Sequence, residues 1–350
     1  MSEPTGGAVN ATRDRASRIA VGTAAAPTPE GDPMLPTRRR PLADFRLMRR
    51  TGVEQWYGEV MHAWQSLHGE TGSGGPPQWR NLGYWTDETR SMTGASRNLA
   101  VKLADAAGVE AGCDVLDVGC GPGESTYLLQ QRLASDGAAR GRLVGMDITQ
   151  RHVDMALARR TGDSPEFVHG DATDVPFPAE SFDRVLALEC AFHFPDRRAF
   201  FAEALRVLRP GGRVGLADVV PTASADAMRR RTRRLLPGPL RSRLDRYIGD
   251  VMKTPPVNLV PAREYAGQLR SAGFTDVTVE DISERVFPHF ARHWERVSQS
   301  DRPEKILRRD ADLVTADARA KAWRRQMDMF VSSWRMSEYL IVTARKPKSA

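Results

Sequence analysis

The sequence predicts an α/β protein with a doubly wound, mostly parallel seven-stranded sheet and helical lid insertions. Two observations support this: after residue 110, short apolar segments alternate with segments of helical periodicity, and glycine-rich turns join them. The expected strands are Asp114–Val118, Arg142–Met146, Glu166–His169, Phe182–Leu188, Arg213–Ala217, Phe274–Glu280 and Glu338–Arg345. The expected helices are Gly94–Ala107, Glu124–Ala134, Arg151–Arg160, Arg198–Leu208 and Ala262–Ala272.

The chain divides into three predicted regions. Residues 1–45 lack periodicity and are predicted to form a disordered basic tail, and residues 46–110 to form a helical cap that includes an amphipathic helix over Val53–Leu67. Residues 111–350 form the main domain, with inserts near 222–260 and 283–335 that interrupt the alternation. Inserts of this kind often cover the carboxyl ends of the strands, where ligands bind, so we expect lids there.

The amino-acid composition indicates the cellular compartment in which the protein is expected. The 350 residues contain 41% hydrophobic residues, but no apolar run long enough to span a bilayer and no apolar signal-peptide core. The three cysteines form no C-x-x-C pair, which favours buried thiols in a reducing compartment. We therefore predict a cytoplasmic protein with no membrane partner. The apolar face of the Val53–Leu67 helix leaves a homo-oligomer open.

The formal charge of +7 raises the question of a nucleic-acid partner. The arginine run from Arg229 to Arg246 is not interleaved with aromatic residues, so a solvated or helix-capping role is favoured and no nucleic-acid partner is expected, although an acidic partner remains open. His289 and His293 have metal-pair spacing, but no third ligand is near in sequence. We interpret them as part of a solvated helix face and expect no metal.

The strongest motif is the segment Val115–Gly123, which follows a predicted strand and opens a helix. Its glycines, Gly119, Gly121 and Gly123, allow a tight turn and a close approach to a ligand. The spacing is G-x-G-x-G, and Glu124 stands where the helix begins. A carboxylate there would repel the pyrophosphate of a dinucleotide. S-adenosylmethionine (SAM) has no phosphate and carries an ammonium and a sulfonium, so the motif favours SAM over NAD.

Two further acids follow the next two strands. Asp147 lies 147 − 123 = 24 residues after Gly123, near the spacing of about 20 typical of a ribose-binding carboxylate, although a helix N-cap is the alternative. Asp171 and Ala172 follow the third strand.

Together with Arg209–Gly212, these features resemble the class I SAM-dependent methyltransferases over roughly Asn81 to Arg345. The resemblance implies a Rossmann-like fold, with Asp117 near the methionine part of SAM and Asp171 near the adenine. The cofactor-binding set that it implies is Tyr84, Trp85, Asp117, Gly119, Cys120, Gly121, Gly123, Asp147, Ile148, Asp171, Ala172 and Glu189.

The candidate general base is His193, just past the fourth predicted strand and thus at the edge of the sheet beside the cofactor. An imidazole with a pKa near 6.5 suits proton acceptance, whereas the alternative is a histidine packed between Phe192 and Phe194. Asp218 ends the fifth strand and is expected to act in catalysis, by orienting His193 or by binding substrate.

Three features look like the natural-product branch of this family, which includes sugar O-methyltransferases of erythromycin and rebeccamycin assembly. They are the segment Asn81–Trp85, the segment Ala187–Phe194 that contains His193, and Asp218. In that group the Gly-Tyr-Trp element closes over the cofactor, which implicates Tyr84 and Trp85; a core position is the alternative for Trp85. The segment Glu189–Phe194 also lacks the D/N-P-P-Y/F motif of nucleic-acid amino methyltransferases.

We therefore expect O-methylation of a hydroxyl on a small sugar or polyketide-like acceptor in secondary metabolism. Two alternatives stay open: a C-methyltransferase acting on a prenyl or aromatic carbon, and a SAM-binding cyclase without methyl transfer.

Overall fold

The computed structural model describes residues 78–133, 141–162, 164–299 and 331–348. The predicted tail, the predicted Val53–Leu67 helix and most of the second insert lie outside the described residues. All of the described residues belong to one compact unit.

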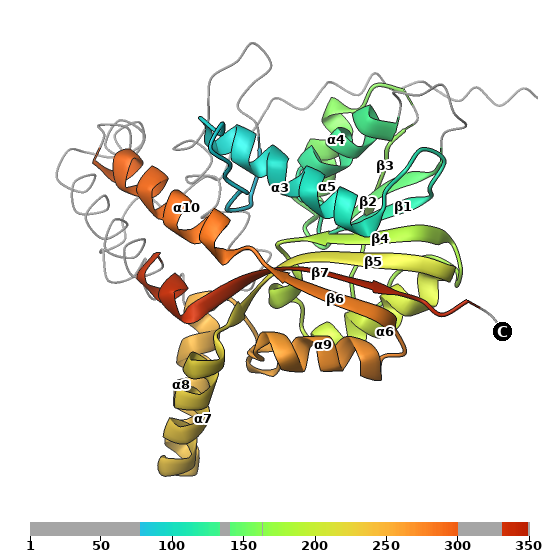
Figure 1. Ribbon diagram of the computed structural model, residues 1–350. Helices are drawn as coiled ribbons and strands as arrows, with labels where there is room; N and C mark the ends of the chain where they lie inside the picture. Colours follow the sequence, from blue (N-terminus) through green and yellow to red (C-terminus); the bar gives the residue numbers. More distant parts are fainter. Residues whose placement is uncertain (1–77, 134–140, 163, 300–330, 349–350) are drawn as a thin grey trace, which may run out of the picture. The chain divides into compact units, whose positions relative to one another are not determined.

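Seven strands form one sheet in the order β3-β2-β1-β4-β5-β7-β6 (Figure 1). The first five strands pair in parallel, and β7 is antiparallel to both β5 and β6. The strands are β1 (Val115–Val118), β2 (Leu143–Asp147), β3 (Glu166–His169), β4 (Phe182–Leu188), β5 (Leu208–Pro221), β6 (Thr275–Asp281) and β7 (Ser337–Arg345). The predicted α/β, mostly parallel seven-stranded sheet is confirmed.

Strand β5 is much longer than the sequence predicts, because it pairs with β7 from Arg213 to Pro221. That pairing continues the sheet past the level where the parallel strands end. Residues Arg209–Gly212, which precede the predicted strand Arg213–Ala217, belong to β5 as well.

Helices cover both faces of the sheet. In Figure 1, α3 (Met92–Ala107), α4 (Glu124–Leu133) and α5 (Gln150–Arg159) lie on one face, and α6 (Arg197–Val207) and α9 (Ala262–Ser271) on the other. The first insert is a pair of helices, α7 (Ala223–Leu235) and α8 (Gly238–Met252), and the second begins with α10 (Ser283–Ser298). Short 3₁₀ turns are η1 (Ala191–His193), η2 (Pro256–Asn258) and η3 (Trp334–Met336).

Helix ends follow their local sequence. The Ser91 side chain accepts a hydrogen bond from the Gly94 N–H and so caps α3, and Asp196 caps α6 in the same manner through the Arg198 N–H. Gly108 ends α3 in the left-handed region with φ +68°, which a residue with a Cβ adopts only at a cost.

Two hydrophobic clusters hold the layers together. One joins α3 and α10 to the sheet through buried residues such as Leu99, Phe290 and Trp294. The other lies under α6 and α9 and includes Phe200 and Leu269. The beginning of the second insert is therefore part of the core on the α3 face.

Candidate functional site

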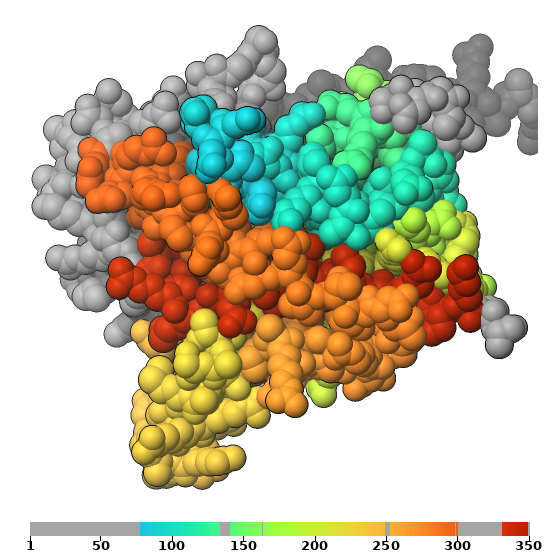
Figure 2. Space-filling model, viewed as in Figure 1, coloured from blue at the N-terminus to red at the C-terminus, as the bar shows by residue number. Residues whose placement is uncertain are grey.

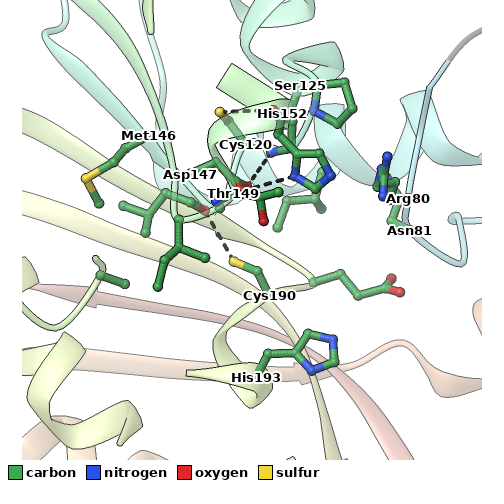
Figure 3. Close-up of a pocket in the computed structure, with 18 of the residues that line it drawn as sticks. Arg80, Asn81, Cys120, Ser125, Met146, Asp147, Thr149, His152, Cys190 and His193 are labelled. Atoms are coloured by element: carbon green, nitrogen blue, oxygen red, sulfur yellow. Dashed lines mark hydrogen bonds and ion pairs between the residues drawn. The ribbon is translucent and has the colours of Figure 1, made fainter. Parts of the chain in front are cut away.

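A pocket of about 440 Å³ opens at the carboxyl ends of β1, β2 and β4, where a doubly wound sheet binds ligands (Figure 3). Of the predicted cofactor-binding residues, those that line this pocket are Gly119, Cys120, Gly121, Asp147, Ile148, Asp171, Ala172 and Glu189. The candidate base His193 lines it as well. We call this space the cofactor pocket.

The glycine loop lines one wall of the pocket through Gly119 and Gly121, whereas Gly123 does not line it. Gly119, Gly121 and Gly123 have φ values of +68°, +56° and +89°, so each requires glycine. A Cβ at Gly119 would stand 2.6 Å from Cys190 Sγ, and one at Gly123 would meet the Phe167 ring at 3.0 Å. The loop therefore approaches the pocket on one side and the sheet on the other with no room for a side chain.

Asp117 supports this loop from behind. It is 1% exposed and is not among the residues that line the pocket. Its Oδ2 accepts hydrogen bonds from Ser125 Oγ at 2.6 Å and Thr126 Oγ1 at 2.7 Å, at the start of α4. Burial raises the pKa of Asp117 to about 6. Asp117 therefore lies beneath the loop, whereas Ser125 itself lines the pocket, and the expected place of Asp117 near the methionine part of SAM stays a prediction.

Asp147, at the end of β2, anchors the opposite side of the loop. Its Oδ2 accepts the Gly121 N–H at 2.9 Å, and its Oδ1 accepts the Thr149 N–H at 2.8 Å and lies 3.1 Å from His152 Nδ1. Burial opposes ionisation, but these hydrogen bonds, led by that of His152, outweigh it and lower the pKa of Asp147. Asp147 is therefore not the N-cap of α5, which is Thr149; its carboxylate supports the turn before that helix and lines the pocket.

The far end of the pocket is suited to a flat, partly apolar group. Ile148 is 42% exposed although it is a large hydrophobic residue, and it lines the pocket beside Asp171 and Ala172. The Asp171 carboxylate accepts hydrogen bonds from the Thr173 N–H and Oγ1, both at 2.8 Å, which fixes its position.

Glu189 joins three distant segments at the pocket wall. It follows β4 with φ +54°, and its Oε2 accepts the Leu82 N–H at 2.9 Å and the hydroxyl of Tyr339 on β7. Burial raises the pKa of Glu189 to about 8, so the carboxyl is largely protonated at neutral pH. The side chain links the segment before α3 to the sheet.

His193 lies in η1 at the lower end of the pocket (Figure 3). Its Nδ1 is 2.7 Å from the Lys253 carbonyl oxygen, which can only accept, so Nδ1 carries the proton and Nε2 is the basic nitrogen. Burial lowers the pKa of His193 to about 4. The imidazole is therefore neutral over the physiological range and has its tautomer set for proton acceptance at Nε2.

Of the two roles expected of Asp218, the binding of substrate does not fit its position, whereas an indirect hold on His193 does. It is 0% exposed, lines neither this pocket nor a second one on the other side of η1, and is not bonded to His193. Its carboxylate pairs with buried Arg197, with Oδ2 3.3 Å from Nε, and accepts the Tyr265 hydroxyl at 3.0 Å. It also accepts the Phe192 N–H at 3.1 Å. Asp218 thus holds the turn on which His193 stands.

The expectation for Tyr84 and Trp85 is also corrected, because neither lines the cofactor pocket. Trp85 is 4% exposed and packs on His289 and His293 of α10, with ring centroids 6.3 Å and 5.7 Å away. The core alternative for Trp85 is thus the observed one, and the two histidines do not form a purely solvated face. Among the described residues, no group of three or more His, Cys, Asp or Glu is placed to hold a metal.

Residues just before the Gly-Tyr-Trp element line the pocket instead. They are Gln78, Trp79, Arg80 and Asn81, and sequence reasoning missed them together with Thr149 and His152. The Gln78 N–H donates to Glu124 Oε1 at 3.0 Å, which ties this segment to the start of α4. The signal for His152 was its place one turn into the helix that follows Asp147.

The second pocket, of about 270 Å³ and mostly apolar, lies on the other side of η1. Phe192 contributes to its wall, and the adjacent His193 lines the cofactor pocket. Met228, Leu244 and Ile248 of the first insert line the second pocket, with Asn258 at its polar end. We call this space the apolar pocket.

Asn258 is a further residue that the sequence did not single out. It is 2% exposed, and its Nδ2 donates to the carbonyl oxygens of Phe192 at 3.3 Å and Phe194 at 2.6 Å, while its Oδ1 accepts the Arg197 N–H at 2.9 Å. Asn258 and Asp218 therefore hold η1 from two sides.

Comparisons with known proteins agree with this geometry. Residues 116–216 match a family model described as a methyltransferase domain. Erythromycin 3''-O-methyltransferase from Saccharopolyspora erythraea is 35% identical over 277 residues, which cover 76% of this chain and 83% of the relative. The 27-O-demethylrifamycin SV methyltransferase from Amycolatopsis mediterranei is 30% identical, over 76% of this chain and 89% of the relative.

Among solved structures, the [4+2]-cyclase SpnF is similar, with a TM-score of 0.59 and 26% identity over 85% of this chain and 96% of that one. The methyltransferase relatives match most of this chain at 30% identity or more. The chain therefore belongs to the SAM-dependent methyltransferase family.

Proposed function

We propose that this protein transfers the methyl group of SAM to a hydroxyl of a small natural product, a sugar or polyketide-like acceptor. The observation that carries the proposal is His193, a neutral imidazole whose Nδ1 proton is fixed on the Lys253 carbonyl oxygen; it lines the cofactor pocket, and its neighbour Phe192 lines the apolar pocket. The names of the two methyltransferase relatives, both acting on oxygen, support the same acceptor chemistry.

The residues present fit SAM. Asp147 keeps a carboxylate at the pocket wall, which suits the ribose hydroxyls, and Asp171 with Ala172 and Ile148 suits the adenine end. The glycine loop leaves backbone space for the methionine part, and the Glu124 carboxylate disfavours a phosphate at the start of α4. The bound cofactor supplies an activated methyl group on sulfur, and no metal is needed for that chemistry.

The acceptor is proposed to occupy the apolar pocket with its hydroxyl near η1. As the acceptor oxygen bonds to the methyl carbon, the carbon–sulfur bond breaks and its electron pair stays on the sulfur of S-adenosylhomocysteine. The hydroxyl proton moves to His193 Nε2. Alignment of the two reactants accounts for about 7–11 kcal/mol of barrier reduction in well-oriented reactions, and a positioned base for about 10²–10⁴-fold.

The test combines an acceptor panel with a variant. The protein is incubated with SAM and hydroxylated macrolides and glycosides, and the product mass and S-adenosylhomocysteine are measured together. His193→Ala is expected to lower kcat by about 10²–10⁴-fold while SAM binding persists. His289→Ala removes a half-exposed histidine outside both pockets and serves as the matched control. Full turnover by the His193→Ala variant would sink the proposal for this residue.

A second candidate is a SAM-binding cyclase without methyl transfer. The 26% identity with the [4+2]-cyclase SpnF over most of both chains favours a cyclase over a C-methyltransferase. A cyclase would convert a polyene substrate with no mass gain and no S-adenosylhomocysteine. A C-methyltransferase would instead depend more on Phe192 and Phe194 than on His193, because aromatic rings stabilise a developing cation.

A further inference from the structure

The first insert projects from the body of the domain as a helical hairpin. Helices α7 and α8 extend away from the sheet, and their joined ends lie far from both layers of helices (Figures 1 and 2). Near the base, the inner face of the hairpin lines the apolar pocket. The outer end contributes to neither pocket.

The end of the hairpin is apolar and exposed. We call residues 235–240, with the sequence Leu-Leu-Pro-Gly-Pro-Leu, the hairpin tip. Leu235 is 77% exposed, the largest value among the exposed large hydrophobic residues that the structure describes, and Leu240 is 44% exposed. No side chain in the tip carries a charge or a polar group. An apolar surface presented this way at a projecting end indicates an interaction site.

Arginines surround the tip. Residues 223–252 contain eight Arg against three Asp, a net charge of +5 in a chain whose total is +7. Arg231 and Arg234 lie in the last turns of α7, and Arg241 and Arg243 in the first turns of α8; we call these four the arginine collar. They are exposed and have no ion-pair partner among the described residues. By contrast, Asp226 near the base pairs with Arg229 and Arg230, and Asp245 of α8 pairs with Arg233.

We propose that this hairpin docks the protein on an anionic lipid surface. An apolar tip with a cationic collar matches the boundary between acyl chains and acidic headgroups, because leucine side chains enter the apolar layer and guanidinium groups remain at the phosphates. A second copy of the chain is disfavoured, since two faces of this charge repel each other. Among the described residues, no helix is long and apolar enough to cross a bilayer, so the contact is interfacial.

The proposal revises the prediction of no membrane partner, which rested on the lack of a spanning segment. It also has a consequence that rests on the proposed acceptor site: Met228, Leu244 and Ile248 connect the hairpin to the apolar pocket, so an apolar acceptor dissolved in the bilayer would reach that pocket along the hairpin.

The experiment measures vesicle binding with the full-length protein. Co-sedimentation is carried out with vesicles of equal phosphatidylglycerol and phosphatidylcholine and with phosphatidylcholine alone, at low and high salt. Binding is expected for the anionic vesicles and is expected to weaken with salt. Each collar arginine is expected to contribute about 5-fold, so Arg231→Gln with Arg234→Gln lowers the affinity by roughly 25-fold. Leu235→Gln with Leu240→Gln lowers it by at least about 10-fold.

Two matched controls separate the hairpin from general surface effects. Arg151→Gln with Arg270→Gln removes the same charge elsewhere, and Leu157→Gln removes a leucine that is 37% exposed on α5; both should bind like the unmodified protein. Circular dichroism checks that every variant is folded, and S-adenosylhomocysteine formation from a soluble acceptor tests methyl transfer separately.

Three outcomes would overturn the proposal. The protein could fail to bind anionic vesicles, or the control variants could lose as much affinity as the hairpin variants. The hairpin variants could also bind as well as the unmodified protein, which would assign binding to another segment such as the basic N-terminal tail. Binding of soluble polyglutamate without vesicle binding would instead identify an acidic protein partner. A protein that binds vesicles but forms no S-adenosylhomocysteine would argue against the proposed function and not against the docking of the hairpin.

Discussion

The buried pair of Asp218 and Arg197 provides a direct test of how η1 is held. Both side chains are 0% exposed, and the Asp218 carboxylate also accepts hydrogen bonds from the Phe192 N–H, the Val219 N–H and the Tyr265 hydroxyl. Asp218→Asn keeps an oxygen for the two backbone donors but removes the negative charge. Arg197 then remains as an uncompensated buried cation, which costs about 3–5 kcal/mol.

The assay is equilibrium unfolding in urea. A loss of stability is measured as a lower midpoint urea concentration, with the dependence of the unfolding free energy on urea concentration unchanged. Arg198→Gln, which breaks the exposed ion pair to Asp196 in the same helix, is the matched control and should cost at most about 1 kcal/mol. The double variant Asp218→Asn with Arg197→Met removes both charges and should be more stable than Asp218→Asn alone. A single-variant cost below about 1 kcal/mol, or a double variant as unstable as the sum of its parts, would refute the reasoning.

The same variant separates positioning from cofactor binding. Because Asp218 supports η1 but lines neither pocket, kcat should fall while the affinity for SAM is retained. An equal loss in cofactor affinity would show that the carboxylate acts on the cofactor pocket itself.

Three further predictions concern the pocket walls. If His193 is the base, the acid limb of kcat/KM should have a pKa nearer 4 than 6.5, because the imidazole is buried; a limb near 6.5 in a pH–rate profile would contradict this. Burial raises the pKa of Glu189 in the folded protein to about 8, from an ordinary value of 4.5. Between these two pH values the folded state holds a proton that the unfolded state has lost. The free energy of unfolding therefore falls as the pH rises through this range, by up to about 1.4 kcal/mol per pH unit. Glu189→Gln should remove this slope in denaturation curves measured from pH 5 to 8.5. Gly119→Ala places a Cβ 2.6 Å from Cys190 Sγ at φ +68°, so it should abolish SAM binding in calorimetry and cost about 1–3 kcal/mol; unchanged binding would contradict the loop geometry.

The sheet was predictable because each strand is a short apolar segment bounded by turn residues. Glu166–His169 and Phe182–Leu188 form strands with the predicted bounds. The length of β5 was not predictable, since it depends on antiparallel pairing with β7, a strand more than a hundred residues later in the chain. Local pattern determines where a strand begins, but its partner determines how far it continues.

In the candidate site, too, local features of the sequence were predictable and contacts with distant segments were not. Glycine spacing and the acids after two strands predicted residues that line one pocket at the carboxyl ends of the strands, because those features act through the local backbone. The surroundings of Trp85 and Asp218 were not predictable, because they come from distant segments. Trp85 packs on α10, and Asp218 meets Arg197 and Tyr265. An acid at a strand end has the same sequence pattern whether it faces a ligand or a buried arginine.

The 3₁₀ turn η1 contributes neighbouring residues to two pockets. Its two adjacent residues, Phe192 and His193, face different pockets, and its position is fixed by Asp218 and Asn258. In the proposed mechanism, proton acceptance therefore depends on the single side chain of His193, whereas the shape of the apolar pocket depends on the insert. Replacing that histidine would leave both pockets intact, so loss of methyl transfer need not remove the capacity to bind SAM and fold an acceptor beside it.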